Sequence, residues 1–133
     1  MGTVVLDASV VLALFDPEDA LHASASVAAR ERRAAGDDFL LPASVLAEVL
    51  VGAARRGDAE LASRRALAIA AFGPPHPVDE DVAVAAARRR ARHRSLRLPD
   101  ALVIAAADVV GADAVLTGDK HWEGLDPRIT VIR

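Results

Sequence analysis

The sequence predicts a three-layer α/β/α sandwich with a mainly parallel central sheet, folded as a single domain over residues 1–133. Short apolar runs without polar alternation recur along the chain, which is typical of parallel strands covered by helices on both faces. Longer segments with helical apolar spacing separate these runs, as expected for strands that alternate with helices. With 133 residues, 53% of them hydrophobic, the chain can bury one real core but not two.

The first apolar run, residues 4–6, predicts a strand that is buried on both faces and ends at Asp7. A short helix is expected over residues 9–15, ending before Pro17. Pro17 suits the first position of the next helix, because the N–H that proline lacks is unsatisfied there in any case. That second helix is predicted to run from 17 to about 35.

The middle of the chain predicts a second buried strand at residues 39–41 and two further helices. The third helix is expected over 45–56, where apolar residues recur at helical spacing. A fourth helix over 59–72 ends where glycine and two prolines follow at 73–75. A short edge strand is expected around 76–78.

The last third predicts two helices and two strands. A fifth helix begins with the acids of residues 79–81, which complement its positive end, and finishes in the strongly basic run 88–97. A sixth helix is expected over 101–110, followed by strands at 114–117 and 129–132. The sheet is therefore assembled from segments far apart in sequence.

Composition excludes several classes of function. The absence of cysteine excludes disulfides, thiolate metal sites and a cysteine nucleophile, and it fits a reducing compartment. The net charge of −3 argues against a globally basic nucleic-acid binder. No apolar stretch approaches the ~20 residues that span a bilayer, so we expect a cytoplasmic protein without a membrane partner.

Four carboxylates occupy comparable places in the predicted fold. Asp7 and Asp119 each follow an apolar strand, whereas Glu48 and Asp100 each lie near the start of a helix that follows a proline. If the strands are parallel neighbours, all four acids lie at the carboxyl edge of the sheet, where ligands bind in open α/β folds. Taken singly, the three aspartates could instead be helix caps, and Glu48 could lie at the edge of an apolar stripe.

Four converging acids without basic partners would repel, by ~1 kcal/mol per pair at 4 Å even in a water-like dielectric. A bound divalent cation removes this conflict. Ligands that are all oxygen suit Mg²⁺ or Mn²⁺, which commonly bind through a few carboxylates together with substrate phosphates. Such an ion can activate water for attack on phosphorus, and two ions can share that work.

The residues around these acids resemble an ordered motif set. In chain order, the pieces are Leu6-Asp7-Ala8-Ser9, Ser44-Val45-Leu46-Ala47-Glu48-Val49, Leu98-Pro99-Asp100-Ala101-Leu102-Val103-Ile104-Ala105 and Leu116-Thr117-Gly118-Asp119. In this order and spacing they resemble the PIN-domain ribonucleases, and most closely the VapC toxins of bacterial toxin-antitoxin modules. The resemblance covers nearly the whole chain.

The resemblance implies a Mg²⁺- or Mn²⁺-dependent endoribonuclease that forms a homodimer and is inhibited by a cognate VapB-type antitoxin. It assigns catalytic and metal-binding roles to four acids, which are Asp7, Glu48, Asp100 and Asp119. It further implies a supporting hydroxyl at Ser9 and an orienting role for Thr117.

Basic residues near the third acid are candidates for RNA contact. Arg88, Arg89 and Arg92 could follow an RNA backbone, because phosphate neutralisation dominates nucleic-acid affinity. They could equally form a solvated helix end that complements the helix dipole. His121, two residues after Asp119, is the histidine best placed to touch substrate.

Two other functions fit parts of the sequence. A phosphatase-like hydrolase could form an aspartyl-phosphate at Asp7, although such chemistry generally needs a second acid two residues later, where this chain has Ser9. A non-catalytic RNA- or protein-binding module would use the acids as helix caps and the arginines for binding. Dependence on a metal ion distinguishes that module from the nuclease.

Overall fold

The computed structural model describes all 133 residues and contains one sheet of four parallel strands in the order β2-β1-β3-β4. The strands are β1 (Thr3–Leu6), β2 (Asp38–Leu40), β3 (Ala114–Thr117) and β4 (Ile129–Val131). Every pairing is parallel: Val5 lies opposite Leu40 on one side and Val115 on the other. The predicted parallel sheet is confirmed, and β1 and β3 occupy its centre.

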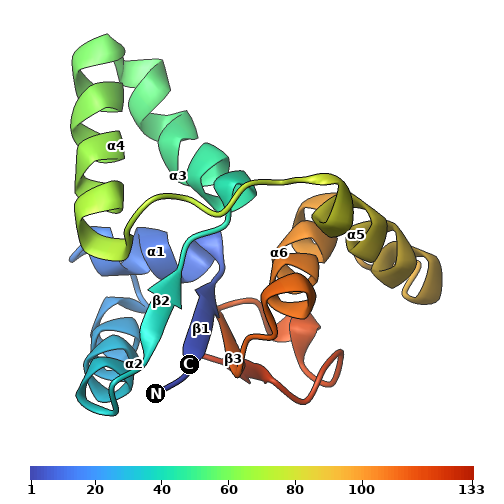
Figure 1. Cartoon of the computed structure of the whole chain (residues 1–133). Coiled ribbons are helices and arrows are strands. Elements are labelled where there is room, and N and C mark those ends of the chain that lie inside the picture. Colours follow the sequence, from blue (N-terminus) through green and yellow to red (C-terminus); the bar gives the residue numbers. More distant parts are fainter.

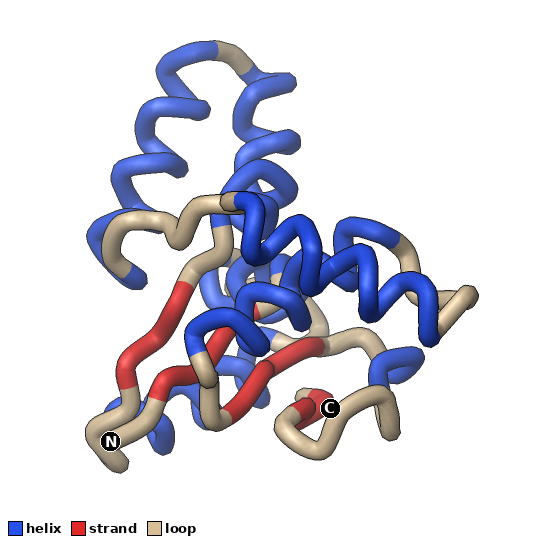
Figure 2. Tube along the Cα trace, turned by 45° about the vertical axis from the view of Figure 1, so that its right-hand side comes forward, coloured by secondary structure: helices blue, strands red, loops and turns tan.

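Six helices and one short 3-10 helix surround this sheet. They are α1 (Ala8–Phe15), α2 (His22–Ala34), α3 (Ala43–Arg56), α4 (Asp58–Phe72), α5 (Glu80–Arg92), α6 (Leu98–Val110) and η1 (Lys120–Trp122). Helices α1 and α2 lie on one side of the sheet and α5 and α6 on the other, while the α3–α4 hairpin extends away from it (Figure 1). Figure 2 shows the strands between these helical layers, so the predicted three-layer sandwich is confirmed.

The core is built where the apolar runs predicted it. Val4, Val5 and Leu6 of β1 are completely buried, as is Val115 of β3. Helix α6 is buried along most of its length, with every residue from 103 to 107 inaccessible. Three of those five residues are alanines, which allow the helix to pack closely against both the sheet and α5.

The second helix begins later than predicted. Helix α2 starts at His22 rather than at Pro17, because the carboxylates of Asp16 and Asp19 accept the backbone N–H groups of Glu18 and Leu21 in successive turns. Such local side-chain bonds compete with helix formation.

The second strand also differs from its prediction. It covers 38–40 rather than 39–41, and as an edge strand it is half-buried instead of enclosed on both faces. The completely buried residue is Leu41, just beyond the strand. Around 76–78 only His76 pairs with the sheet region, as a single parallel bridge to Pro42, so no full strand forms there.

No helix of the structure combines the length and the apolar character needed to cross a membrane.

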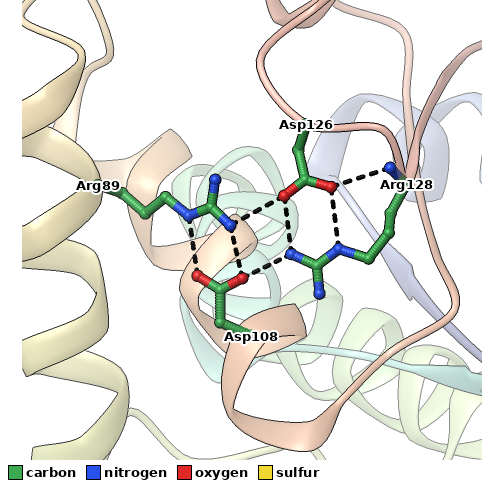
Figure 3. A network of polar contacts seen from close by, with 4 residues as sticks. All are labelled: Arg89, Asp108, Asp126 and Arg128. Atoms are coloured by element: carbon green, nitrogen blue, oxygen red, sulfur yellow. Dashed lines mark hydrogen bonds and ion pairs between the residues drawn. The ribbon is translucent and has the colours of Figure 1, made fainter.

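A network of two arginines and two aspartates joins the last third of the chain (Figure 3). Arg89 of α5 donates to Asp108 of α6 at 2.7 and 2.9 Å and to Asp126 at 2.8 Å. Arg128 donates to both aspartates as well, with Nε 2.9 Å from Asp126 Oδ1. The network therefore ties α5, α6 and the segment before β4 together.

Asp126 is the most enclosed member of the network, with its side chain 8% exposed, and its replacement by Asn should destabilise the fold. Hydrogen bonds from Arg128 and then Arg89 hold the pKa of Asp126 well below its usual range, so its stabilisation is present at neutral pH and is lost only in strong acid. We expect Asp126→Asn to lower the free energy of unfolding by about 2 kcal/mol at pH 7 in urea titrations.

Glu123→Gln provides the matched control. Its carboxylate also pairs with an arginine, Arg133 at 2.8 Å, but both side chains are exposed. Such a pair is worth about 0–1 kcal/mol, so equal losses in the two variants would contradict a structural role for the network.

Candidate active site

Asp7 lies at the carboxyl edge of the sheet, between the two central strands. It follows β1 directly, and its backbone N–H donates to the carbonyl of Leu116 in β3 at 3.0 Å. Only 8% of the residue is exposed. The carboxylate is thus placed where the ends of two parallel strands meet, as the sequence predicted.

Two hydroxyl groups hold the Asp7 carboxylate. Ser9 Oγ and Thr117 Oγ1 each donate to the same oxygen, Oδ2, at 2.8 Å. Both hydroxyls are themselves fixed, because Ser9 Oγ accepts from the N–H of Gly118 at 2.9 Å and Thr117 Oγ1 accepts from the N–H of Asp119 at 3.0 Å. The supporting positions predicted for Ser9 and Thr117 are therefore in direct contact with Asp7.

Glu48 lies in the second turn of α3 and Asp100 in the first turn of α6, and their charges are linked to that of Asp7. Burial raises the pKa of Asp7 above its ordinary value, hydrogen bonds from Ser9 and Thr117 oppose this, and the charge of Asp100 adds to it. Partial burial of the Glu48 carboxylate raises its pKa, and the charges of Asp7 and Asp100 raise it further. Three of the four predicted acids therefore act on one another electrostatically.

Glu48 is exposed and lies at the edge of the apolar stripe of its helix, which is one of the two places that the sequence allowed. Helix α3 buries Val45, Val49 and Ala53, and Glu48 lies beside this stripe, not within it. The carboxylate thus reaches solvent at the mouth of the site.

Asp119 is the fourth acid and lies at the start of η1. Its Oδ1 accepts from the backbone N–H of His121 at 2.9 Å and is 2.9 Å from the ring Nδ1 of the same residue. Burial acts to raise the pKa of Asp119, but these contacts and the charge of Arg97 outweigh it and lower the pKa. His121 itself projects into solvent, with its side chain 95% exposed.

Helix capping accounts for one of the three aspartates. Asp119 caps η1 through its side chain. Asp7 occupies the cap position of α1 without making a side-chain cap bond, and the cap position of α6 is filled by Arg97, not by Asp100. Capping therefore does not explain Asp7 or Asp100.

Arg97 is a member of the site that the sequence did not reveal. Its Nε donates to Asp100 Oδ2 at 3.3 Å, so the expectation that the acids lack a basic partner is wrong for Asp100. The sequence did contain a signal for this ion pair. Arg97 and Asp100 are three residues apart at the start of a helix, and residues at that spacing lie on the same helix face.

The chemistry of the acids fits a divalent cation better than their spacing does. All the donors are oxygens, as Mg²⁺ and Mn²⁺ prefer, and burial first, then the charges of neighbouring acids, raise the pKa values of Asp7 and Glu48. No three Asp, Glu or His side chains, however, lie close enough together to hold an ion. The acids share an edge and an electrostatic field without forming a closed coordination shell.

Two hollows flank the acids. A groove of about 550 Å³ runs from Glu48 along α3, with Leu12 and Phe15 of α1 on its opposite wall. A smaller hollow of about 170 Å³ is lined by Asp100, His121 and Trp122 among others. Trp122 belongs to the hydrophobic core, so it is a packing residue.

The predicted basic residues divide into two kinds. Arg88 and Arg92 are exposed and line a shallow hollow of about 280 Å³ on α5. The guanidinium of Arg89 is instead held by Asp108 and Asp126, as Figure 3 shows. Arg89 is therefore a structural residue, which corrects its place among the candidates for RNA contact.

A family model describes the same region of the chain. The model of the PIN domain matches residues 4–126, which include all four acids. The chain belongs to the PIN-domain family. The fold class and the family resemblance stated from the sequence are both confirmed.

Solved structures share the fold of this PIN domain. A toxin-antitoxin complex from Klebsiella pneumoniae has a TM-score of 0.73 at 20% identity, covering 96% of each chain. VapC20 of Mycobacterium tuberculosis, a sarcin-ricin loop cleaving toxin, has a TM-score of 0.68 at 23% identity, covering 91% of this chain and 95% of that chain. VapBC2 from Rickettsia felis, bound to a DNA fragment from its promoter, has a TM-score of 0.75 at 12% identity, covering 97% of this chain and 96% of that chain. No curated protein sequence matches this chain significantly.

Proposed function

We propose that this PIN domain is a Mg²⁺- or Mn²⁺-dependent endoribonuclease and the toxin of a VapBC-type toxin-antitoxin pair. The observation that carries the proposal is the environment of Asp7. Its carboxylate is buried at the sheet edge and accepts hydrogen bonds from two hydroxyl groups, and the negative charge of Asp100 raises its pKa further. A fold that maintains this repulsion gains nothing in stability from it, and such arrangements are typical of functional sites.

Asp7, Glu48, Asp100 and Asp119 would hold the divalent ion, which when bound activates water and stabilises charge on the phosphate. The chain's own contribution is orientation. Ser9 and Thr117 fix one oxygen of Asp7 through their hydroxyls, and the bond from the Asp119 N–H to Thr117 couples the positions of the first and last acids. These contacts form the supporting shell that such sites require.

RNA would approach along the exposed side of this edge. Arg88 and Arg92 are free to contact phosphates, and His121 projects into solvent beside Asp119. The structurally similar VapC20 is described as a sarcin-ricin loop cleaving toxin, which supports RNA as the substrate class.

We further propose a VapB-type antitoxin and a second copy of the chain as partners. Structures with the same fold include toxin-antitoxin complexes, which supports the first. Exposed apolar side chains on several helices, including Val51, Leu67 and Val84, support the second.

The two alternative functions are less well supported. A phosphatase would need an acid two residues after Asp7, but Ser9 is there, and its hydroxyl is engaged by both Asp7 and the N–H of Gly118. A binding module would use its acids only as helix caps, but the carboxylates of Asp7 and Asp100 cap no helix.

Metal-dependent cleavage of RNA tests the proposal directly. We expect the purified chain to cut total bacterial RNA at discrete positions with millimolar Mn²⁺ or Mg²⁺, and to lose all cleavage in EDTA. Mapping the product ends by primer extension measures the outcome. Cleavage that persists in EDTA, or RNA that stays intact with both ions, would contradict the proposed activity.

A further inference from the structure

Arg97 lies at the rim of the acid cluster and has donors to spare. Its side chain is 74% exposed, and Nε makes its single hydrogen bond, to Asp100. The terminal nitrogens Nη1 and Nη2 donate to no group of the chain. The charges of Asp100, Glu48 and Asp119 all act on Arg97, although only Asp100 is in contact with it.

The contrast with Arg89 and Arg128 shows what Arg97 is free to do. Each of those arginines donates to both Asp108 and Asp126, an arrangement that holds the guanidinium in place (Figure 3). Arg97 has one partner at the surface, and a single exposed ion pair contributes little to stability. Its guanidinium can therefore exchange Asp100 for another anion at little cost.

Resting on the proposed function, we propose that Arg97 is the residue that binds an RNA backbone phosphate at the active site. The guanidinium contacts Asp100 through Nε at 3.3 Å. The free Nη1 and Nη2 groups of Arg97 can donate to a phosphate of the RNA, with Asp100 as the partner that Nε keeps or gives up. Guanidinium groups suit this role because their planar fork donates two parallel hydrogen bonds to phosphate oxygens.

The proposal predicts effects of opposite sign on two ligands. In Arg97→Gln, Mn²⁺ should bind about three- to tenfold more tightly, because a positive charge is removed from beside the ion. RNA should bind more weakly, and the slope of log affinity against log salt should fall by about 0.7, as for one lost contact to a single strand. Arg97→Lys should keep the parent's Mn²⁺ affinity and recover only part of the RNA affinity, since lysine lacks the fork.

The matched control is Arg94→Gln. Arg94 is exposed and lies three residues earlier, and its side chain pairs with none of the acids. The variant makes the same change in net charge, so it reports what net charge alone contributes. We expect its Mn²⁺ affinity to stay near the parent value.

Mn²⁺ binding is measured by electron paramagnetic resonance without RNA. RNA binding is measured by fluorescence anisotropy with a short mixed-sequence 2′-O-methyl RNA in Ca²⁺, because phosphate contacts do not depend on sequence. Unchanged Mn²⁺ affinity in Arg97→Gln, or equal RNA losses in Arg97→Gln and Arg94→Gln, would overturn the role of Arg97 alone. A parent chain that binds no Mn²⁺ would overturn the proposed function together with it.

Discussion

Asp7→Asn should reduce metal-dependent RNA cleavage by about three orders of magnitude or more, while the fold is retained. The loss is expected because the substitution removes the carboxylate held most firmly at the sheet edge. The fold should survive because Ser9 and Thr117 both donate to the same oxygen of Asp7, which the amide oxygen of asparagine can replace. Initial cleavage rates in Mn²⁺, with circular dichroism spectra of both proteins, measure the outcome.

Asp58→Asn is the control for this variant. Asp58 is an exposed aspartate in the first turn of α4, on the hairpin that extends away from the sheet. Its replacement should leave the cleavage rate within about twofold, since surface substitutions of this kind rarely disturb a fold. Cleavage by Asp7→Asn at the parent rate, in protein free of contaminating nucleases, would refute the assignment of the site.

Asp7 should also lower the stability of the metal-free protein as the pH rises. Burial holds the pKa of Asp7 above its ordinary value of 3.8, so the folded state takes up protons more readily than the unfolded state between the ordinary and raised values. The free energy of unfolding therefore falls with rising pH across that interval, and the loss persists at neutral pH. In EDTA at pH 7, Asp7→Asn should be at least as stable as the parent.

Bound metal should make the parent more stable than Asp7→Asn. An ion that binds only the folded state adds ~2.7 kcal/mol at a hundredfold excess over its dissociation constant, and Asp7→Asn should lose most of that gain. Urea titrations of both proteins, with EDTA or Mn²⁺ and from pH 4 to 7, measure the difference in unfolding free energy. That difference should grow in favour of Asp7→Asn as the pH rises in EDTA.

Asp58→Asn again provides the comparison, because its difference from the parent should be independent of both Mn²⁺ and pH. Two results would contradict the four-acid site: no stabilisation of the parent by millimolar Mn²⁺, and an Asp7→Asn variant that is clearly less stable than the parent in EDTA.

The central strands and the first acid were predictable because their signals are local. An uninterrupted apolar run such as residues 4–6 fits only an enclosed strand or a buried helix, and three residues are too few for a helix. The acid that ends such a run must lie at the strand's carboxyl end. The same reasoning placed Asp119 after β3, where the structure has it.

The sequence-based predictions were wrong where a structure depends on hydrogen bonds from side chains or on residues distant in the sequence. The start of α2 depends on turns closed by Asp16 and Asp19, which compete with the helix that Pro17 suggested. Arg89 appears in sequence as one of a run of exposed arginines, and only the folding of the last third brings Asp108 and Asp126 to it. Periodicity contains no information about such distant pairings.

The hydroxyl contact between Thr117 and Asp7 also has a consequence for biosynthesis. The two residues are separated by 110 positions, and Gly118, whose N–H donates to Ser9 Oγ, is 109 positions from Ser9. During synthesis on a ribosome, β2 can pair with β1 first, but the Asp7 carboxylate lacks β3 beside it and one of its two hydroxyl donors until residues 114–117 have emerged. A nascent chain would thus carry Asp7 without its complete surroundings until 110 further residues have been made. The proposed cleavage of RNA would therefore begin only after β3 has emerged and paired with β1.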